Sequence, residues 1–330
     1  MNGRAELNTS LDPRLSWRAA GDADLEGWAA LIARTAAVER PVWFERRADL
    51  EQVLGSRKNP AATNTVLGTD VEGVARAYAR ITKNPDGDKA VGYGCVDPGW
   101  QGRGIGRGLL GWMEGRARLR FAEDARAGAT PRLRLHSEQQ HTRQAALFGS
   151  AGYRIVRYYH EMHRPLQDGL PEVVLDERFE LVGFGPELRG PVRLAHNDAF
   201  QDHWGSEPRD EEGWGLVVND PLARPDLSAV VLERATGEVA GYQLASHDPV
   251  TAASRGFTEG YTDLLGVRRE FRGHGLARAL LADAMHRFAA AGMDVASLDV
   301  DTENPTGAMA LYATMGYAAV NSSMAWDKEL

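Results

Sequence analysis

Two glycine-rich stretches decide the predicted fold of this chain. The first is VDPGWQGRGIGRGLLGWME, residues 96–114, and the second is VRREFRGHGLARALLADAM, residues 267–285. In each, a strand-like run leads into a turn with several glycines, and apolar residues then recur at helical spacing, as Leu276 and Leu280 do. A strand, a glycine turn and a helix predict an anion site, because the free amides and the dipole of the first helical turn point at one spot.

Two other phosphate-binding motifs fit these turns less well. A Walker A loop ends in Gly-Lys-Ser/Thr, which neither stretch contains. The G-x-G-x-x-G spacing of dinucleotide-binding folds is present at Gly106–Gly111, but the second copy does not keep it. In addition, Pro131 falls where such folds place an acidic residue for the ribose. We therefore favour a phosphate turn of another kind.

The same order of parts occurs twice along the chain. The glycine-rich stretches lie 171 residues apart, and AALFGSAGYRIV (145–156) matches MALYATMGYAAV (309–320) at an offset of 164. Such a period indicates a duplicated domain, since solenoid repeats are about 20–50 residues long. We place the domains at residues 1–168 and 169–330, because HRPLQDGLPEVVLDER (163–178) has the prolines, glycine and charges of a linker.

Each copy has the pattern of an α/β domain. In the second copy, residues 227–235 and 238–246 predict a hairpin, and residues 260–267 and 295–301 predict two further strands. NPTGAMALYATMGY (304–317) predicts a short helix that Asn304 caps, with Pro305 in its first turn and Gly316 at its end. In the first copy, RARLRF (116–121) predicts a solvated helix face.

The composition indicates a soluble protein of about two domains. The chain has 330 residues, 43% of them hydrophobic, and a net charge of −8, which argues against a general nucleic-acid surface. Cys95 is its one cysteine, so an internal disulfide is excluded and a cytoplasmic location fits. Because the sequence lacks a signal peptide and a long apolar run, we expect no membrane association.

The motifs together resemble a known family. The pattern Val-x4-Gln/Arg-Gly-x-Gly-x-Gly/Ala, followed later by Asn-x3-Ala-x2-Leu-Tyr-x3-Gly-Tyr, is similar to the acetyl-CoA-binding core of GNAT-type N-acetyltransferases. Two such domains in one chain resemble the mycothiol synthase-like acetyltransferases. The resemblance implies two tandem GNAT-like domains, each a mixed, mostly antiparallel sheet flanked by helices, with acetyl-CoA as cosubstrate and no metal.

The resemblance also implies which residues contact the cofactor. In that family the glycine turn holds the CoA pyrophosphate, and the strand before it lies beside the pantetheine arm and orients the acetyl carbonyl. In the second copy the matching residues are Leu265, Gly266, Val267, Arg272, Gly273, His274, Gly275, Leu276, Ala277 and Asn304. In the first copy they are Cys95, Val96, Gln101, Gly102, Arg103, Gly104, Ile105 and Gly106. Cys95 could also be only a buried hydrophobe, and Asn304 only a helix cap.

The two copies differ at the position of the family's proton donor. A departing CoA thiolate needs a proton, and a phenol with a pKa of about 10 can supply it at neutral pH. The Leu-Tyr pair of the second copy supplies Tyr312, whereas the first copy has Phe148 there. We therefore predict that residues 169–330 are catalytic and that residues 1–168 bind CoA without turnover. Tyr312 could instead be only a core aromatic residue.

A base for the amine proton is less clearly marked. Glu259, Tyr261 and Asp263 alternate onto one face of the predicted strand, and we expect Asp263 or Glu259 to accept the proton. Asp263 could instead only hydrogen-bond to backbone. His160 and His163 lack the His-Glu-x-x-His spacing of a zinc site, so we expect both to be solvated and predict no metal.

We therefore predict an N-acetyltransferase in which a primary amine of a small molecule attacks acetyl-CoA directly. The alternatives are a CoA-sensing protein without activity on the same fold, and a protein N-acetyltransferase with a groove for a peptide. The acceptor is not evident, although the acidic and aromatic residues of NDAFQDHWG (197–205) could receive an amine. We expect a monomer or homodimer, without nucleic-acid or membrane partners.

Overall fold

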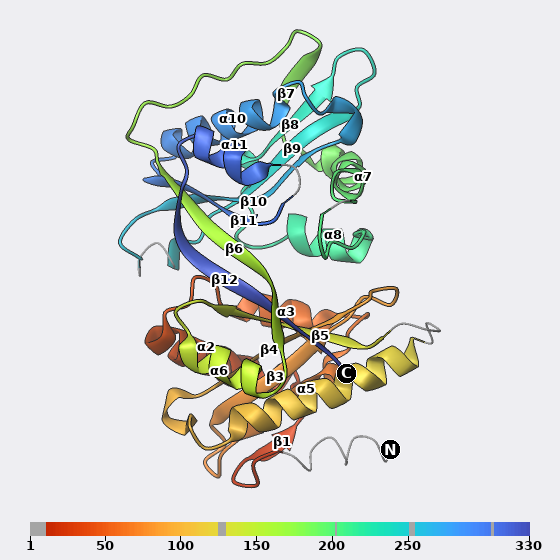
Figure 1. Cartoon of the computed structure of the whole chain (residues 1–330), viewed down its shortest axis with the longest axis vertical. Helices are drawn as coiled ribbons and strands as arrows, with labels where there is room; N and C mark the ends of the chain where they lie inside the picture. Colours follow the sequence, from red (N-terminus) through yellow and green to blue (C-terminus); the bar gives the residue numbers. More distant parts are fainter. Residues whose placement is uncertain (1–10, 125–129, 202, 251–254, 305–306) are drawn as a thin grey trace. The chain divides into compact units, whose positions relative to one another are not determined.

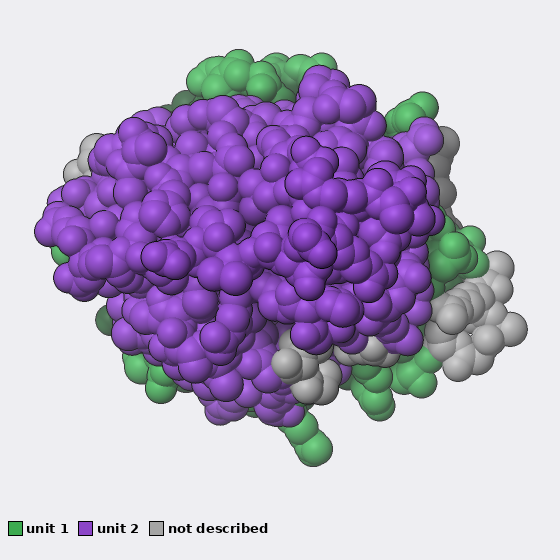
Figure 2. All heavy atoms as spheres, turned by 90° about the horizontal axis from the view of Figure 1, so that it is seen from above, with its two compact units in different colours: residues 1–157, 323–330 green, residues 158–322 purple. Residues whose placement is uncertain are grey.

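The chain forms two compact units, which are coloured separately in Figure 2. Unit 1 comprises Met1–Arg157 with Ser323–Leu330, and unit 2 comprises Tyr158–Ser322. The computed structural model describes residues 11–124, 130–201, 203–250, 255–304 and 307–330. Residue 202 and Pro305, which the sequence pattern included in an acceptor segment and in a helix start, lie outside these ranges.

Unit 1 is built on a six-stranded sheet (Figure 1) with the order β1-β2-β3-β4-β5-β12. All its pairs of known register are antiparallel except β4–β5. The strands are β1 (Ser16–Arg18), β2 (Thr65–Thr69), β3 (Ala75–Thr82), β4 (Ala90–Val96), β5 (Arg132–Glu138) and β12 (Ala318–Glu329). The helices are α2 (Leu25–Glu39), α3 (Arg47–Gly55), α4 (Ala61–Asn64), α5 (Ile105–Glu123) and α6 (Thr142–Ser150).

Unit 2 repeats this plan with the strand order β6-β11-β10-β9-β8-β7. The pair β10–β11 is parallel, and the other pairs are antiparallel. The strands are β6 (Arg154–Pro165), β7 (Phe179–Gly183), β8 (Ala229–Glu233), β9 (Val239–Ser246), β10 (Glu259–Val267) and β11 (Val295–Asp301). The helices are α7 (Arg189–Ala199), α8 (Glu211–Val218), α10 (Leu276–Ala290) and α11 (Ala308–Thr314). The predicted duplication and the predicted α/β fold class are thus confirmed.

Helices cover both faces of each sheet, because alternate strand residues are apolar on both sides. In unit 1, α5 and α6 pack on one face around Ala77 and Leu133, and α2 and α3 pack on the other around Leu67 and Tyr78. Unit 2 has the same layers. Helices α10 and α11 pack on one face and α7 and α8 on the other, where they enclose Tyr242.

The structure places the passage between the units earlier than the predicted boundary near residue 168. Strand β6 is continuous through the predicted linker start, and its residues Tyr159–Pro165 pair with β11 of unit 2. In return, residues Ser323–Glu329 of β12 pair with β5 of unit 1. Each unit therefore takes a strand from the other half of the chain. The linker pattern did not show this, because it begins inside the paired strand β6.

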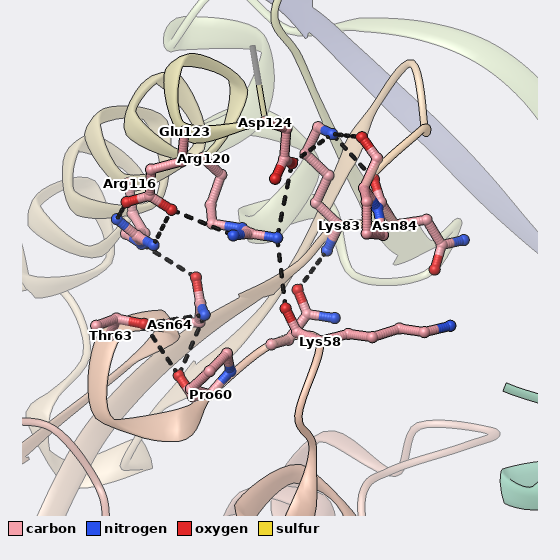
Figure 3. A network of polar contacts seen from close by, with 12 residues as sticks. Lys58, Pro60, Thr63, Asn64, Lys83, Asn84, Arg116, Arg120, Glu123 and Asp124 are labelled. Carbon is pink, nitrogen blue, oxygen red and sulfur yellow. Dashed lines mark hydrogen bonds and ion pairs between the residues drawn. The ribbon is translucent and has the colours of Figure 1, made fainter. Parts of the chain in front are cut away.

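Two local predictions also need correction. Helix α11 begins at Ala308, after Gly307 in a left-handed conformation (φ 73°), so Asn304 lies before the helix and does not cap it. In α5, Arg116 and Arg120 are buried rather than solvated. Figure 3 shows the reason: Arg116 donates to Asn64 Oδ1 (3.0 Å) and to Glu123, and Arg120 donates to Glu123 Oε2 (3.2 Å). The ion pairs with Glu123 lie within α5, and the hydrogen bond from Arg116 to Asn64 ties the end of α5 to the segment around Asn64.

Candidate active site

Strand β10 opens away from its neighbour where the predicted site begins. Its parallel register with β11 runs from Glu259–Val295 to Thr262–Leu298 and ends there. On the other side, β10 stays paired with β9 up to Val267, with a β-bulge between Thr262 and Leu264. The edge of residues Leu264–Val267 that faces β11 therefore has backbone groups available to a ligand, and bulges commonly occur beside active sites.

A cavity of about 350 Å³ lies at this opening. It is walled by the end of β10, the glycine turn, the start of α10, the start of α11 and the end of α7. Its lining residues are Ala199, Phe200, His203, Leu265, Gly266, Val267, Phe271, Arg272, Gly273, Gly275, Leu276, Ala277, Arg278, Asn304, Ala308, Leu311 and Tyr312. Except for His274, all the cofactor residues predicted in the second copy line this cavity.

The glycine turn has the backbone conformation that its sequence suggested. Gly273 (φ 85°) and Gly275 (φ 74°) both lie in the left-handed region, and Gly275 directly precedes α10. A Cβ at either position would meet no atom within 4 Å, so glycine is needed there for the backbone angle and not for space. Gly275, Leu276 and Ala277 line the cavity at the start of α10, where the first amides of a helix have no partner within the helix.

Side chains fix the turn from two sides. The guanidinium of Arg272 donates to the carbonyl oxygens of Val267 (3.4 Å) and Ala199 (3.1 Å), which connects the turn to the end of α7. His274 points elsewhere: its ring packs against Phe179, with 5.6 Å between ring centroids, and it does not line the cavity. Its predicted contact with the cofactor thus gains no support from the cavity.

Gly266 is a glycine because Tyr242 lies directly against it. A Cβ at Gly266 would come within 2.6 Å of the Tyr242 ring. The Tyr242 hydroxyl lies 2.6 Å from Nδ1 of the buried His196, whose pKa burial lowers to about 4, so that this ring is neutral at pH 7. His196 in turn stacks on Phe200, one of the cavity residues, at 4.5 Å between ring centroids. Tyr242 and His196 therefore pack behind Gly266 and Phe200 and hold this part of the cavity wall in place.

Tyr312 reaches the cavity from α11. Only 8% of its surface is exposed, and its ring packs edge-on against Tyr317, with centroids 6.0 Å apart. Burial raises the pKa of Tyr312 to about 12, so the phenol keeps its proton at neutral pH. In unit 1, Phe148 lies at the matching position and contacts Tyr153 with the rings tilted, at 5.9 Å between centroids, but it has no hydroxyl. Both copies therefore place an aromatic ring here, and only the ring of unit 2 carries a proton that it can donate.

Asp263 occupies the β-bulge, outside the residues that line the cavity. Its Oδ1 accepts a hydrogen bond from Ser246 Oγ (3.0 Å). Desolvation, and after it the nearby Asp220, raise the pKa of Asp263 to about 7 against the opposing effect of Ser246. The Asp263 side chain is nevertheless exposed to solvent, which screens this desolvation. A carboxyl group whose pKa is raised and which still contacts solvent can take up and release a proton near neutral pH.

Glu259, the other predicted base, is engaged elsewhere. It is buried, and it accepts hydrogen bonds from Ser297 Oγ (2.6 Å) and Arg255 Nη1 (3.2 Å). Glu161 and His163 lie beside it, and their ligand atoms and that of Glu259 are within 4.8 Å of one another. Arg255 also donates to Glu161 Oε1 (2.5 Å), so an arginine already supplies positive charge to this group. His163 Nε2 lies 2.7 Å from Glu161 Oε1, and His160 Nδ1 lies 2.8 Å from Ser322 Oγ, so neither histidine is simply solvated as predicted.

The glycine turn of unit 1 has the same conformation in different surroundings. Gly102 (φ 73°) and Gly104 (φ 86°) are left-handed. Gln101 Nε2 donates to Val96 O (3.2 Å) and to Glu39 Oε1 (2.7 Å), and His141 Nε2 lies 3.0 Å from Glu39 O. These contacts connect the turns after β4 and β5, whose counterparts in unit 2 wall the cavity.

The remaining predicted residues of unit 1 lie around this turn. Arg103 packs on the Trp100 ring and donates to Gly99 O (2.9 Å). Ile105 is buried in the core, and a Cβ at Gly106 would be 3.1 Å from Leu147. The Cys95 thiol lies against Thr35 of α2, and burial raises its pKa to about 12, so it is no nucleophile. Strand β4 pairs with β3 without a bulge.

Comparison with known proteins places these features in one family. The sequence profile of the acetyltransferase (GNAT) family matches residues 29–153 and 191–317. The chain belongs to the GNAT acetyltransferase family. Both family matches contain a glycine turn, and the second contains Tyr312. GNAT enzymes use acetyl-CoA as cosubstrate, and family membership with the relatives below makes this chain an acetyl-CoA-dependent N-acetyltransferase.

Two relatives named mycothiol acetyltransferase are similar to this chain over most of its length. The mycothiol acetyltransferase of Thermomonospora curvata is 30% identical over 253 residues, which are 74% of this chain and 76% of that protein. The mycothiol acetyltransferase of Salinispora arenicola is also 30% identical, over 78% of this chain and 79% of that protein. These matches fit the predicted resemblance to tandem acetyltransferases of the mycothiol type.

Solved GNAT structures have the same tandem fold. A GCN5-related N-acetyltransferase from Sphaerobacter thermophilus superposes with a TM-score of 0.71 at 25% identity, over 97% of this chain and 96% of that chain. A tandem GNAT protein from the clavulanic acid biosynthesis pathway has a TM-score of 0.69 at 19% identity, over 96% of this chain and 98% of that chain.

None of the helices in the described part of the chain has the length and apolar character needed to cross a membrane.

The α7 side of the cavity was predicted only in part. The sequence indicates NDAFQDHWG (197–205) as a place for the acceptor, and its residues Ala199, Phe200 and His203 line the cavity that the glycine turn walls. The sequence did not predict that they lie beside the glycine turn, because no local motif connects the end of α7 to that turn. Phe271, Ala308 and Leu311 also line the cavity, and their apolar side chains gave no signal beyond core packing.

Proposed function

We propose that unit 2 transfers the acetyl group of acetyl-CoA to a primary amine of a small molecule, by direct attack of the amine on the thioester. The observation that carries this proposal is the cavity in which an anion-binding glycine turn, the opened edge of β10 and the hydroxyl-bearing Tyr312 meet. The relatives named mycothiol acetyltransferase support an acceptor of small-molecule size.

Acetyl-CoA binds, in this proposal, along the opening of β10. The pyrophosphate lies on the amides of residues 273–277 beside the Arg272 guanidinium, where the dipole of α10 favours negative charge. The pantetheine arm runs beside Leu265–Val267, whose backbone groups on that edge are free of a neighbouring strand and orient the acetyl carbonyl. Asn304 closes the other side of the cavity.

The chemistry needs one proton removed and one supplied. The acceptor is a cation when protonated and must become neutral before its nitrogen attacks the carbonyl carbon. We assign the base to Asp263 rather than Glu259, because Glu259 is held by Arg255 and Ser297. As the carbon–sulfur bond breaks, Tyr312 gives its proton to the CoA sulfur. Its pKa of about 12 keeps it protonated until then.

We propose that unit 1 does not catalyse but keeps a weaker site for CoA. Its turn retains two left-handed glycines, which supports anion binding. Phe148 has no proton to give, and β4 has no bulge. Glu39 lies beside this turn, where its side chain accepts a hydrogen bond from Gln101 and its carbonyl oxygen contacts His141, and we infer that it obstructs a pantetheine arm. We therefore expect binding there to require displacement of Glu39.

The test is a product screen with the pure protein. It is incubated with acetyl-CoA and, in separate arms, a panel of small primary amines and a set of peptides, and acetylated products are detected by mass spectrometry. We expect acetylation of at least one small amine, with CoA release that depends on that amine. Acetylation of peptides alone would replace the small-molecule proposal, and CoA release at the same rate without any acceptor would contradict it.

A further inference from the structure

Ser246 occupies a position from which it can control the proposed base. It is the last residue of β9 and stands directly opposite Tyr261 in the β9–β10 register. The β-bulge in β10 brings Asp263 to the same side of the sheet, where its Oδ1 accepts the Ser246 Oγ hydrogen bond at 3.0 Å. A donor at this distance favours the carboxylate over the neutral acid.

The backbone holds Ser246 firmly in this place. On one side it pairs with Tyr261, and on the other it forms an antiparallel bridge with Ala223, in the segment that follows α8. The neighbouring bonds from Arg224 N to Ala245 O (2.8 Å) and from His247 N to Leu222 O (3.0 Å) extend this pairing. Because the backbone of Ser246 is already held by two neighbouring segments, its hydroxyl loses little conformational entropy when it binds the carboxylate.

Few other groups act on Asp263. Among the described residues, Asp220 from the segment after α8 raises its pKa, Ser246 from β9 lowers it, and Tyr261 lies nearby on the same strand. Described residues bring no arginine or lysine into contact with its carboxyl group. Ser246 is therefore the main group that opposes desolvation and the negative charge of Asp220.

We propose that Ser246 is a positioning residue that orients the Asp263 carboxylate and keeps its proton affinity low enough for it to act as a base at neutral pH. The proposal rests on the proposed function, in which Asp263 takes the proton of the amine. It adds that the hydroxyl at residue 246, although outside the cavity lining, sets the pH range of the reaction.

Direct titration of Asp263 tests this without any acceptor. The carboxyl carbon of Asp263 is followed by NMR in protein labelled at aspartate, and the signal is assigned as the one absent in Asp263→Asn. Ser246→Ala should raise the titration midpoint by about one pH unit, because one hydrogen bond to the charged form is lost. Ser246→Thr keeps the hydroxyl and should restore the wild-type midpoint. An unchanged midpoint in Ser246→Ala would overturn the proposal.

Rate profiles then separate this inference from the function on which it rests. With an amine found in the screen, the acidic limb of kcat/KM should move to higher pH in Ser246→Ala by the same interval, with little change above the limb. Thr236→Ala is the matched control, since its hydroxyl bonds the carboxylate of Glu233 at the opposite end of β9. If Asp263→Asn keeps the wild-type limb, Asp263 is not the base. If Asp263→Asn removes the limb but Ser246→Ala leaves it unmoved, only the role of Ser246 fails.

Discussion

At the scale of residues, one hydroxyl distinguishes the two copies. Tyr312 contacts the ring of Tyr317, and Phe148 contacts the ring of Tyr153 at the matching position, but only Tyr312 carries a hydroxyl. The sequence alone predicted this contrast, because the motif fixes the position of the Leu-Tyr pair. It could not rank Asp263 above Glu259, because that ranking depends on Arg255 and Ser297, which only the fold brings to Glu259.

The raised pKa of Asp263 predicts a change of stability with pH. Its folded-state pKa of about 7 lies above the ordinary aspartate pKa of 3.8, so the folded protein binds the proton more tightly than the unfolded chain. The stabilisation linked to that proton is present at low pH and lost as pH rises through about 7. Because the residue is partly exposed, solvent screening makes this effect modest.

Asp263→Asn should therefore stabilise the protein more at pH 8.5 than at pH 4.5, since the amide stays neutral throughout. Thermal unfolding of variant and wild type at both pH values checks this, with Asp299→Asn as a comparison on the neighbouring strand. A difference in Tm between variant and wild type that is the same at both pH values would contradict the raised pKa.

At the scale of elements, the glycine turn and the first turn of α10 have the backbone conformation expected of an anion site. The strand, turn and helix were predictable because each has a strong local signal: alternation, left-handed glycines and helical spacing. The contact between α7 and the turn could not be predicted, because it joins residues far apart in the sequence, Arg272 and Ala199. The buried arginines of α5 were misjudged for the same reason, because Asn64 and Lys58 come from distant segments (Figure 3).

A negative charge introduced at each glycine turn should affect the two units differently. Gly275→Glu places a carboxylate where the pyrophosphate is proposed to lie, and we expect acetyl-CoA affinity in unit 2 to fall by about tenfold to a hundredfold. Gly275→Ala carries the same backbone strain without the charge and is the matched control. Gly104→Glu should leave turnover nearly unchanged. Isothermal titration with CoA and rate assays measure both, and equal affinities for Gly275→Glu and Gly275→Ala would contradict the anion role.

At the scale of the whole molecule, the units exchange their last strands. Sequence periodicity showed the duplication, but both copies have the same strand pattern, so nothing in it indicated that β12 finishes the sheet of unit 1. Trp326 of β12 packs on Phe148 and donates to Ser137 Oγ (2.9 Å), and Asp327 binds Arg134 through two hydrogen bonds. The end of the chain is thus part of the core of the first unit.

Trp326→Ala should destabilise unit 1 although it lies close to the C-terminal end. Removal of this buried ring is expected to cost about 3–5 kcal/mol. Urea unfolding measures the loss, and acetyl-CoA binding by unit 2 should persist in the variant at low urea. Val320→Ala, at an exposed position of the same strand, is the control and should change stability little. Equal effects of the two substitutions would contradict the exchanged strand.

The central claim is that unit 2 catalyses through Tyr312, and removal of one hydroxyl tests it most directly. Turnover and acetyl-CoA affinity are measured for Tyr312→Phe and for Phe148→Tyr with an amine found in the screen. We predict that Tyr312→Phe lowers kcat by about 10²–10⁴-fold with acetyl-CoA binding nearly unchanged, and that Phe148→Tyr has no effect. A silent Tyr312→Phe together with a changed rate in Phe148→Tyr would show that catalysis had been assigned to the wrong unit.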